Sequence, residues 1–279
     1  MKITSPIFLQ QASNVGRVKG YLKLSFDSDD PILGDITGNG DITVTSIKNG
    51  EKISNTYSSP DALTISVQAD AYSEIVLIGD IRTFANNDYS DANLCEASNL
   101  SSLSYLDFES NESSLDLIIA DCPVLTGVTS MYNSRGGGVE ISNCPELDNV
   151  TLSSGSFDYI TIANAPRLRA LRIDDNAMMP NFDISGAPRL QFFDCRYCAS
   201  LTELDLSENM QLTTLSCEGC EKVNVIHYNA TQPEPSSAIA NLIRENADLQ
   251  GIVYTDRNAP YFENIESAAI DSGWTIEQL

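Results

Sequence analysis

An eleven-residue repeat runs through the middle of the chain and constrains its fold more than any other feature. Within each eleventh, apolar residues alternate with polar ones, as in Leu204-Asp205-Leu206, which is the pattern of a short strand with one buried face. The apolar anchors recur at intervals of eleven with a single interval of ten, at Leu106, Leu117, Val128, Val139, Val150, Ile160, Leu171, Phe182, Phe193, Leu204, Leu215 and Ile226.

Successive eleven-residue segments are of two kinds that alternate, so the structural unit is a pair of segments, about 22 residues long. One kind ends in Asn, Cys or Gly, as in LRALRIDDN from Leu168, and the other ends in a turn with Pro, as in ITIANAPRL from Ile160. A unit of this length with two strands and two turns has no room for a multi-turn helix. Stacked at the ~4.8 Å strand spacing, such units form parallel sheets around one apolar core. The sequence therefore predicts a mostly β protein, a right-handed parallel β solenoid of roughly six coils.

The repeats resemble those of leucine-rich-repeat proteins. The segment LTELDLSENMQLTTLSCEGC from Leu201 is similar to the bacterial short-repeat branch, in which Cys often replaces Asn, and the resemblance spans about Leu100 to Tyr228. It implies a curved solenoid that serves as a protein-binding scaffold without catalysis of its own.

The two ends depart from the repeat and predict caps. The runs GYLKLSF, DITVTSI and ALTISVQ predict an antiparallel β segment in residues 1–72, which precedes a solenoid at 73–230. Residues 231–279 predict a strand-helix-strand cap, with a first helix at 238–245 capped by Ser237 and a second opened by Pro260 and ended by Gly273. Stacked folds need such caps because an uncovered last coil exposes core and unpaired main chain.

The charge of the chain limits its partners. With 39 acidic and 16 basic residues the net charge is −23, so nucleic acid and anionic lipid surfaces repel the chain. Residues 1–20 hold no signal-like apolar run, and no apolar stretch approaches membrane-spanning length. We expect no membrane insertion and a monomer. The compartment stays open, with the missing signal favouring an intracellular protein.

Two Cys-x-x-Cys pairs match the spacing of a zinc ribbon but are expected in the core. Cys195 and Cys217 occupy the repeat position of Ile173, and Cys198 and Cys220 occupy the position of Asn176. A buried thiol packs as a small hydrophobe. We therefore predict no metal site and no cofactor.

Two further motifs have chemical alternatives. Asp183, Asp205 and His227 recur at intervals of 22 and predict one exposed column, in which a hydrolase could use a carboxylate beside an imidazole. The segment Asp27–Asp41 holds several aspartates around Gly38-Asn39-Gly40. It is predicted to be a hairpin turn, and whether it binds calcium stays open.

The binding surface is predicted on the strands that carry the Asn, Cys or Gly ending, at residues of the types enriched at binding hot spots. Asp194 is also expected to be exposed there, and two pairs 22 apart, Arg172 with Asp194 and Asp174 with Arg196, are expected to be strand neighbours. We predict a non-enzymatic scaffold for a protein or peptide ligand, with a structural or assembly component, surface or phage-like, as the alternative. The predicted binding residues are Tyr105, Tyr132, Arg172, Phe192, Arg196 and Tyr197.

Overall fold

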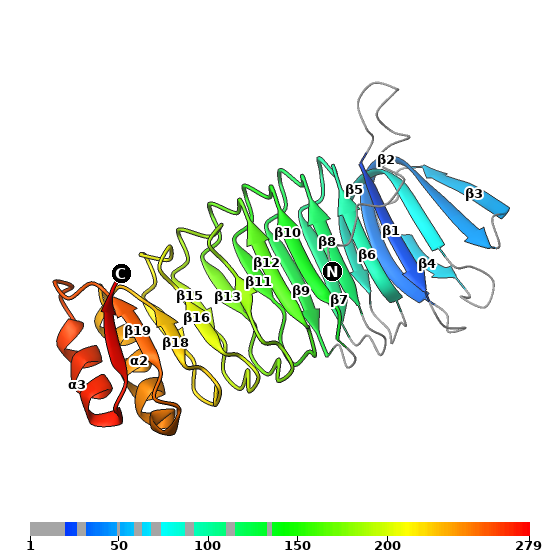
Figure 1. The fold of residues 1–279 in the computed structure, drawn as a ribbon. Helices are drawn as coiled ribbons and strands as arrows, with labels where there is room; N and C mark the ends of the chain where they lie inside the picture. Colours follow the sequence, from blue (N-terminus) through cyan, green and yellow to red (C-terminus); the bar gives the residue numbers. More distant parts are fainter. Residues whose placement is uncertain are drawn as a thin grey trace.

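The computed structural model describes residues 20–26, 32–48, 51–58, 63–67, 74–86, 92–109, 115–132 and 136–279. The described chain is an elongated stack of coils, with the N-terminal strands at one end and two helices at the other (Figure 1). Among the described residues, no helix is both long enough and apolar enough to span a membrane.

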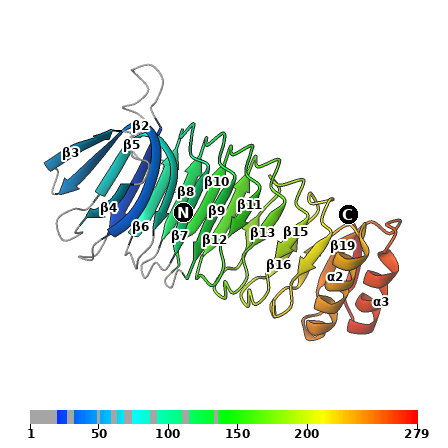
Figure 2. The same ribbon diagram turned by 180° about the vertical axis from the view of Figure 1, so that it is seen from behind.

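Each coil contributes one strand to each of two parallel rows, which Figure 2 shows from behind. The row with the predicted binding residues is called the ladder face, and the other row is called the opposite face. The ladder face consists of β7 (Tyr105–Glu109), β9 (Gly127–Met131), β11 (Asn149–Thr151), β13 (Ala170–Arg172), β15 (Phe192–Asp194) and β17 (Thr214–Ser216). The opposite face consists of β8 (Asp116–Ala120), β10 (Gly138–Ser142), β12 (Tyr159–Ala163), β14 (Phe182–Asp183), β16 (Glu203–Asp205) and β18 (Val225–His227).

The pairing registers confirm the repeat. Val150 pairs with Val128 and Leu171, and Phe193 pairs with Leu171 and Leu215. The interval of ten between Val150 and Ile160 shortens one step of each row to 21, since Val150 pairs with Leu171 and Val139 with Ile160. The deletion therefore removes one residue from a turn without changing the inward column.

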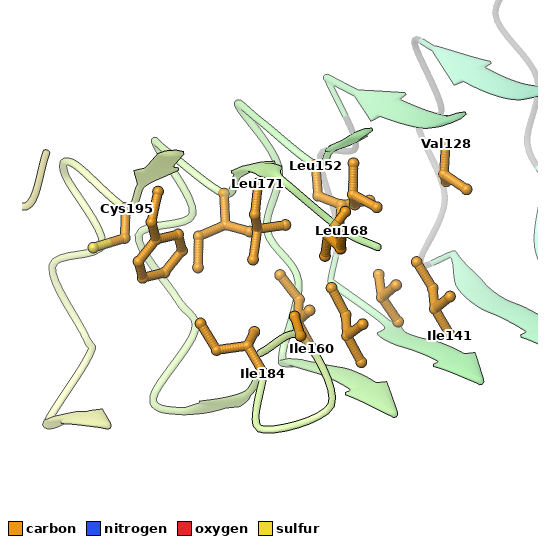
Figure 3. Packing of buried hydrophobic residues seen from close by; sticks show 14 of the residues in the cluster. Val128, Ile141, Leu152, Ile160, Leu168, Leu171, Ile184 and Cys195 are labelled. Carbon is orange, nitrogen blue, oxygen red and sulfur yellow. The ribbon is translucent and has the colours of Figure 1, made fainter. Parts of the chain in front are cut away.

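The apolar anchors of both rows point into a single interior. Leu171 from the ladder face and Ile160 from the opposite face lie toward each other across this interior (Figure 3), and both are fully buried. Phe182 and Phe193 meet edge to face across it, with 5.3 Å between ring centroids. The predicted parallel β solenoid is thus confirmed.

The N-terminal strands close one end of the stack by joining the two rows. Strand β1 pairs antiparallel with both β5 and β6, and through this contact the ladder face and the opposite face as far as β14 belong to one 16-stranded sheet. Strands β5 and β6 themselves pair parallel with β7 and β8 at an interval of 22, as the repeat does. The bounds are β1 (Tyr21–Phe26), β2 (Ile32–Lys48), β3 (Glu51–Ser58), β4 (Leu63–Val67), β5 (Glu74–Asn86) and β6 (Ala92–Ser98).

The predicted hairpin turn at Gly38-Asn39-Gly40 is wrong. These residues lie inside β2, which pairs with β5 on both sides of them while the register shifts. Gly40 has a φ of 77° there, so the glycines permit a bulge in a continuous strand instead of a reversal. Asp27 to Asp30, which belong to the calcium question, lie outside the described residues.

The C-terminal segment extends the opposite face and covers the last coil. Strand β19 (Ile252–Thr255) pairs parallel with β18, and β20 (Thr275–Gln278) pairs with β19. Two helices, α2 (Pro233–Glu245) and α3 (Phe262–Ser272), pack on each other. Glu234 in α2 accepts a hydrogen bond from the main-chain N–H of Leu215 in β17, at 2.9 Å.

The first helix begins earlier than predicted. It starts at Pro233, and Ser237 lies inside it with its hydroxyl donating to the carbonyl of Pro233. Proline is favoured in the first helical turn because the N–H that it lacks has no acceptor there, so the two prolines of QPEPSS belong to the helix. The short helix η2 (Ala247–Leu249) follows α2. The second helix, α3, ends at Gly273 as predicted, and this glycine has a φ of 71°.

The opposite face is interrupted once. Strand β14 pairs with β12, and β16 pairs with β18, but β14 and β16 do not pair, so β16, β18, β19 and β20 form a separate four-stranded sheet. On the ladder face, the same coils stay joined through β13, β15 and β17. The gap therefore opens the stack on one side only.

Candidate binding surface

Four of the six predicted residues lie close together on the ladder face. Arg172 ends β13 and its guanidinium lies over the ring of Phe192, which begins β15, at 4.9 Å from the ring centroid. Such a stack restrains both side chains, and a cation over an exposed aromatic face is worth about 0.5–1 kcal/mol. Arg196 and Tyr197 follow β15 directly.

Asp194 fixes the two arginines in place. Its carboxylate accepts two hydrogen bonds from Arg196, at 2.8 Å from Nε and 2.7 Å from Nη2, and it lies 3.9 Å from Nη1 of Arg172. The predicted exposure of Asp194 is wrong, since only 1% of its surface is exposed. Two parallel charge-assisted bonds set the plane of a guanidinium as well as its position. The carboxylate beside Arg196 also raises the pKa of that guanidinium.

The predicted pairing of these charges is half right. Arg172 does reach Asp194 on the neighbouring strand, but Arg196 turns back to Asp194 instead of reaching Asp174. Arg196 also lies 3.7 Å from Glu218 in the next coil. The charges form a chain from Arg172 to Glu218, because Asp194 stands between both arginines.

Tyr197 and Tyr105 each cover a glycine of the following coil. A side-chain carbon added to Gly219 would lie 2.5 Å from the ring of Tyr197, and one added to Gly127 would lie 2.7 Å from the ring of Tyr105. An aromatic ring over a glycine shields the main chain that the missing side chain would expose. Tyr197 and Gly219 also have matching left-handed φ angles of 59° and 76°.

The remaining two predicted residues lie elsewhere on the same face. Tyr105 shares the repeat position of Phe192 four coils away, and Tyr132 shares that of Tyr197 three coils away. At ~4.8 Å for each strand spacing these separations are roughly 19 and 14 Å. The structure therefore brings together Arg172, Phe192, Arg196 and Tyr197, which we name the arginine-aromatic cluster, and not Tyr105 or Tyr132.

A groove with three further arginines runs along the turns before the cluster. Its volume is about 690 Å³, and Arg167, Arg169 and Arg189 line it. Arg167 pairs with Glu146, and Arg169 pairs with Asp148, at 2.9 Å between Nη2 and Oδ2. The hydrogen bond from Arg169 lowers the pKa of the Asp148 carboxyl. Arg189 has no carboxylate partner among the described residues. Sequence reasoning did not single out this groove.

The cysteines lie in the core as their repeat positions predict. Cys198 donates to the carbonyl of Ile173 at 3.2 Å, and Cys220 donates to the carbonyl of Cys195 at 3.0 Å. Asn176 serves the same position one coil earlier, with its amide donating to Leu152 and Ile173. Burial raises the pKa of the Cys95 and Cys217 thiols. Within the part of the chain that the structure describes, no group of three or more Asp, Glu, His or Cys side chains is arranged to hold a metal ion.

The column proposed for a hydrolase is only partly assembled. Asp205 and His227 are register neighbours, but the Asp205 carboxylate binds Ser207 in its own turn. His227 instead lies 3.2 Å from Glu203 and stacks on Tyr254, at 4.5 Å between ring centroids. Asp183 lies on β14, across the interruption. The imidazole is thus held by groups other than the two predicted aspartates.

Comparison with known proteins shows the family. Residues 55–218, more than half of the chain, match the leucine-rich repeats of the FBD-associated F-box protein At5g56370. The chain is a leucine-rich-repeat protein. Neither the search of curated proteins nor the search of solved structures found a significant match. Leucine-rich-repeat proteins typically lack catalysis and serve as scaffolds for protein interaction, and the resemblance to the bacterial short-repeat branch stays a prediction.

Proposed function

We propose that this leucine-rich-repeat protein is a non-catalytic scaffold that binds a protein or peptide through the ladder face, with the arginine-aromatic cluster as its anchor. One observation carries the proposal: Asp194 is almost fully buried, while the side chains of its two arginine partners, Arg172 and Arg196, remain 50% and 35% exposed. The carboxylate is enclosed by the chain itself, while Phe192, Arg172 and Tyr197 stay accessible to a partner.

The cluster is ordered before any partner arrives. The bidentate contact to Asp194 and the stack on Phe192 restrict both guanidinium groups, so less conformational entropy is lost on binding. Aromatic and arginine side chains in a fixed arrangement are the common anchors of protein interfaces. The unbroken strand pairing of β13, β15 and β17 supplies a rigid base.

The experiment selects peptides from a random phage-displayed library on the immobilised chain and measures their affinity for variants. We expect the double substitution Phe192→Ala and Tyr197→Ala to weaken binding roughly 30-fold, as the loss of about 2 kcal/mol at anchor residues produces. The melting temperature should fall by no more than about 4 °C.

The matched control substitutes two apolar residues that lie outside the ladder strands, Met178→Ala and Ile270→Ala. They are the two most exposed apolar side chains among the described residues, at 64% and 70%. The control should keep the affinity of the parent chain. Equal losses in the two double variants, or peptides that bind both as well as the parent, would refute the ladder face as the binding surface.

A further inference from the structure

The interruption between β14 and β16 leaves a cleft on the opposite face, away from the arginine-aromatic cluster. Its volume is about 370 Å³, within the range of pockets that hold small ligands or single side chains. Phe182 and Ile184 supply apolar surface, and Asp183, Glu203, Asp205 and Glu208 supply carboxylates. None of the described residues that line it is a Lys or Arg.

A main-chain donor faces this cleft without a partner. In the next coil the N–H of Leu206 donates to the carbonyl of His227 at 2.8 Å. One coil earlier the equivalent bond would join Ile184 to Asp205, and among the described residues the N–H of Ile184 makes no hydrogen bond. Ile184 is only 1% exposed. An acceptor that enters the cleft can therefore form the hydrogen bond that the carbonyl of Asp205 does not supply here.

The two aspartates of the cleft each present one free oxygen. The Oδ1 atom of Asp183 accepts from the N–H and hydroxyl of Ser185, at 3.0 and 2.7 Å. The Oδ1 atom of Asp205 accepts from Ser207 in the same way, at 3.0 and 2.7 Å. These bonds orient both carboxylates, and neither Oδ2 atom makes a hydrogen bond to any residue that the structure describes. Like charges at one repeat position of neighbouring coils repel, and a cation between them would relieve that repulsion.

An aromatic pair lies on β18 and β19, next to the strand that carries Asp205. His227 is the register neighbour of Asp205, and its ring stacks on Tyr254 of β19 with an interplanar angle of 8°. Both side chains are half buried. The pair gives a flat surface beside the carboxylates, on which an extended chain can lie.

We propose that the cleft between β14 and β16 binds a basic segment of a partner protein, with one Lys or Arg side chain between Asp183 and Asp205. The cationic group meets the free carboxylate oxygens, and its aliphatic stem packs on the partly exposed ring of Phe182. A main-chain carbonyl of the same segment can accept from Ile184. The site is more than a group of acidic residues, because the unbonded N–H of Ile184 and the cleft both lie where, among the described strands, the opposite face is interrupted.

The test uses a fluorescein-labelled peptide, Gly-Ser-Arg-Gly-Ser-Arg-Gly-Ser, and a second peptide with citrulline in place of Arg. Binding to the full chain is followed by fluorescence anisotropy at about 0.15 M salt, where long-range attraction is screened beyond ~8 Å. We expect Asp183→Asn with Asp205→Asn to weaken binding of the Arg peptide about tenfold. Asparagine keeps an Oδ1 acceptor for Ser185 and Ser207, so the turns should remain folded.

The matched control is Glu263→Gln with Asp271→Asn, which removes two exposed charges from α3. Both variants change the net charge from −23 by the same amount, and the control should lose less than twofold. Equal losses in both variants would show general attraction to an acidic chain and overturn the proposal, as would equal binding of the citrulline peptide. Phe192→Ala with Tyr197→Ala should leave this binding unchanged, so the result does not depend on the ladder face.

Discussion

The ladder face and the opposite face are built from the same repeat, yet one is continuous and the other is interrupted. From β5 to β17 every ladder strand pairs with the next. On the opposite face the pairing fails between β14 and β16, although the amide of Asn209 still reaches the carbonyls of Ile184 and Ala187 in the preceding coil. The repeat thus fixes how the coils stack, while strand pairing can differ between the two faces at the same coil.

The largest effect should come from the aromatic pair that joins the two faces. Phe193→Ala removes a fully buried ring beneath the continuous face and should cost about 3–5 kcal/mol of unfolding free energy. Phe182→Ala removes its partner, which borders the cleft and is only partly buried, and should cost about 1–2 kcal/mol. Urea unfolding measures both.

Comparable costs for the two phenylalanines would mean that the cleft side is as tightly packed as the ladder side. That outcome would remove the physical contrast between the faces. Phe192→Ala is a useful reference, since this ring lies on the outer surface beside Phe193 and contributes little to the core.

Substitutions of buried asparagines should also distinguish the two faces, with smaller losses of stability than the substitution of Phe193. Asn176 is fully buried and donates to two carbonyls, at 2.6 and 2.8 Å, so Asn176→Ala should cost about 2–3 kcal/mol. Asn209→Ala should cost about 1–2 kcal/mol. It should also speed amide hydrogen exchange in β16, because Asn209 supplies the side-chain bond across the gap. Mass spectrometry of deuterium uptake locates the change.

The conservative control is Asn176→Cys, because Cys198 and Cys220 perform the same role in the next two coils. It should recover part of the stability that alanine loses. If Asn209→Ala leaves exchange in β16 unaltered, the strands are held together by contacts other than this amide.

The fold could be predicted from the sequence because the same apolar pattern recurs in every coil. The same inward position is occupied in successive coils by Leu171, Phe193 and Leu215. Each repeat therefore supports the assignment of inward positions in the others. The bulge at Gly38 and the helix start at Pro233 were missed because each depends on one local segment, where the same residues also suit a turn or a loop.

The binding surface was predictable by position but not by contact. Repeat position and residue type predicted one exposed face for Arg172, Phe192, Arg196 and Tyr197. In the structure these residues lie close together on that face. The burial of Asp194 could not be predicted, because it depends on which way the Arg196 side chain turns. The interruption at β14 also has no clear sequence signal, since FDISGAPRL repeats the pattern of ITIANAPRL.

The smallest expected effect is a difference in stability between two variants. One variant removes a carboxylate that has a cationic partner, and the other removes a carboxylate that has none. On the side of the arginine groove, Arg169 lowers the pKa of Asp148 below its usual value of about 3.9. A lowered pKa in the folded state stabilises the fold at pH values above about 4, and this contribution disappears as the pH falls through the lower folded value. Asp148→Asn should therefore reduce stability slightly at neutral pH, and this loss should shrink as the pH falls below about 4. Asp183→Asn, at the cleft, should not reduce stability at neutral pH, because it removes one of two like charges. Urea midpoints measured from pH 7 down to about 2 compare the variants, and a loss for Asp183→Asn as large as that for Asp148→Asn would show that a cationic group of the chain already neutralises the cleft.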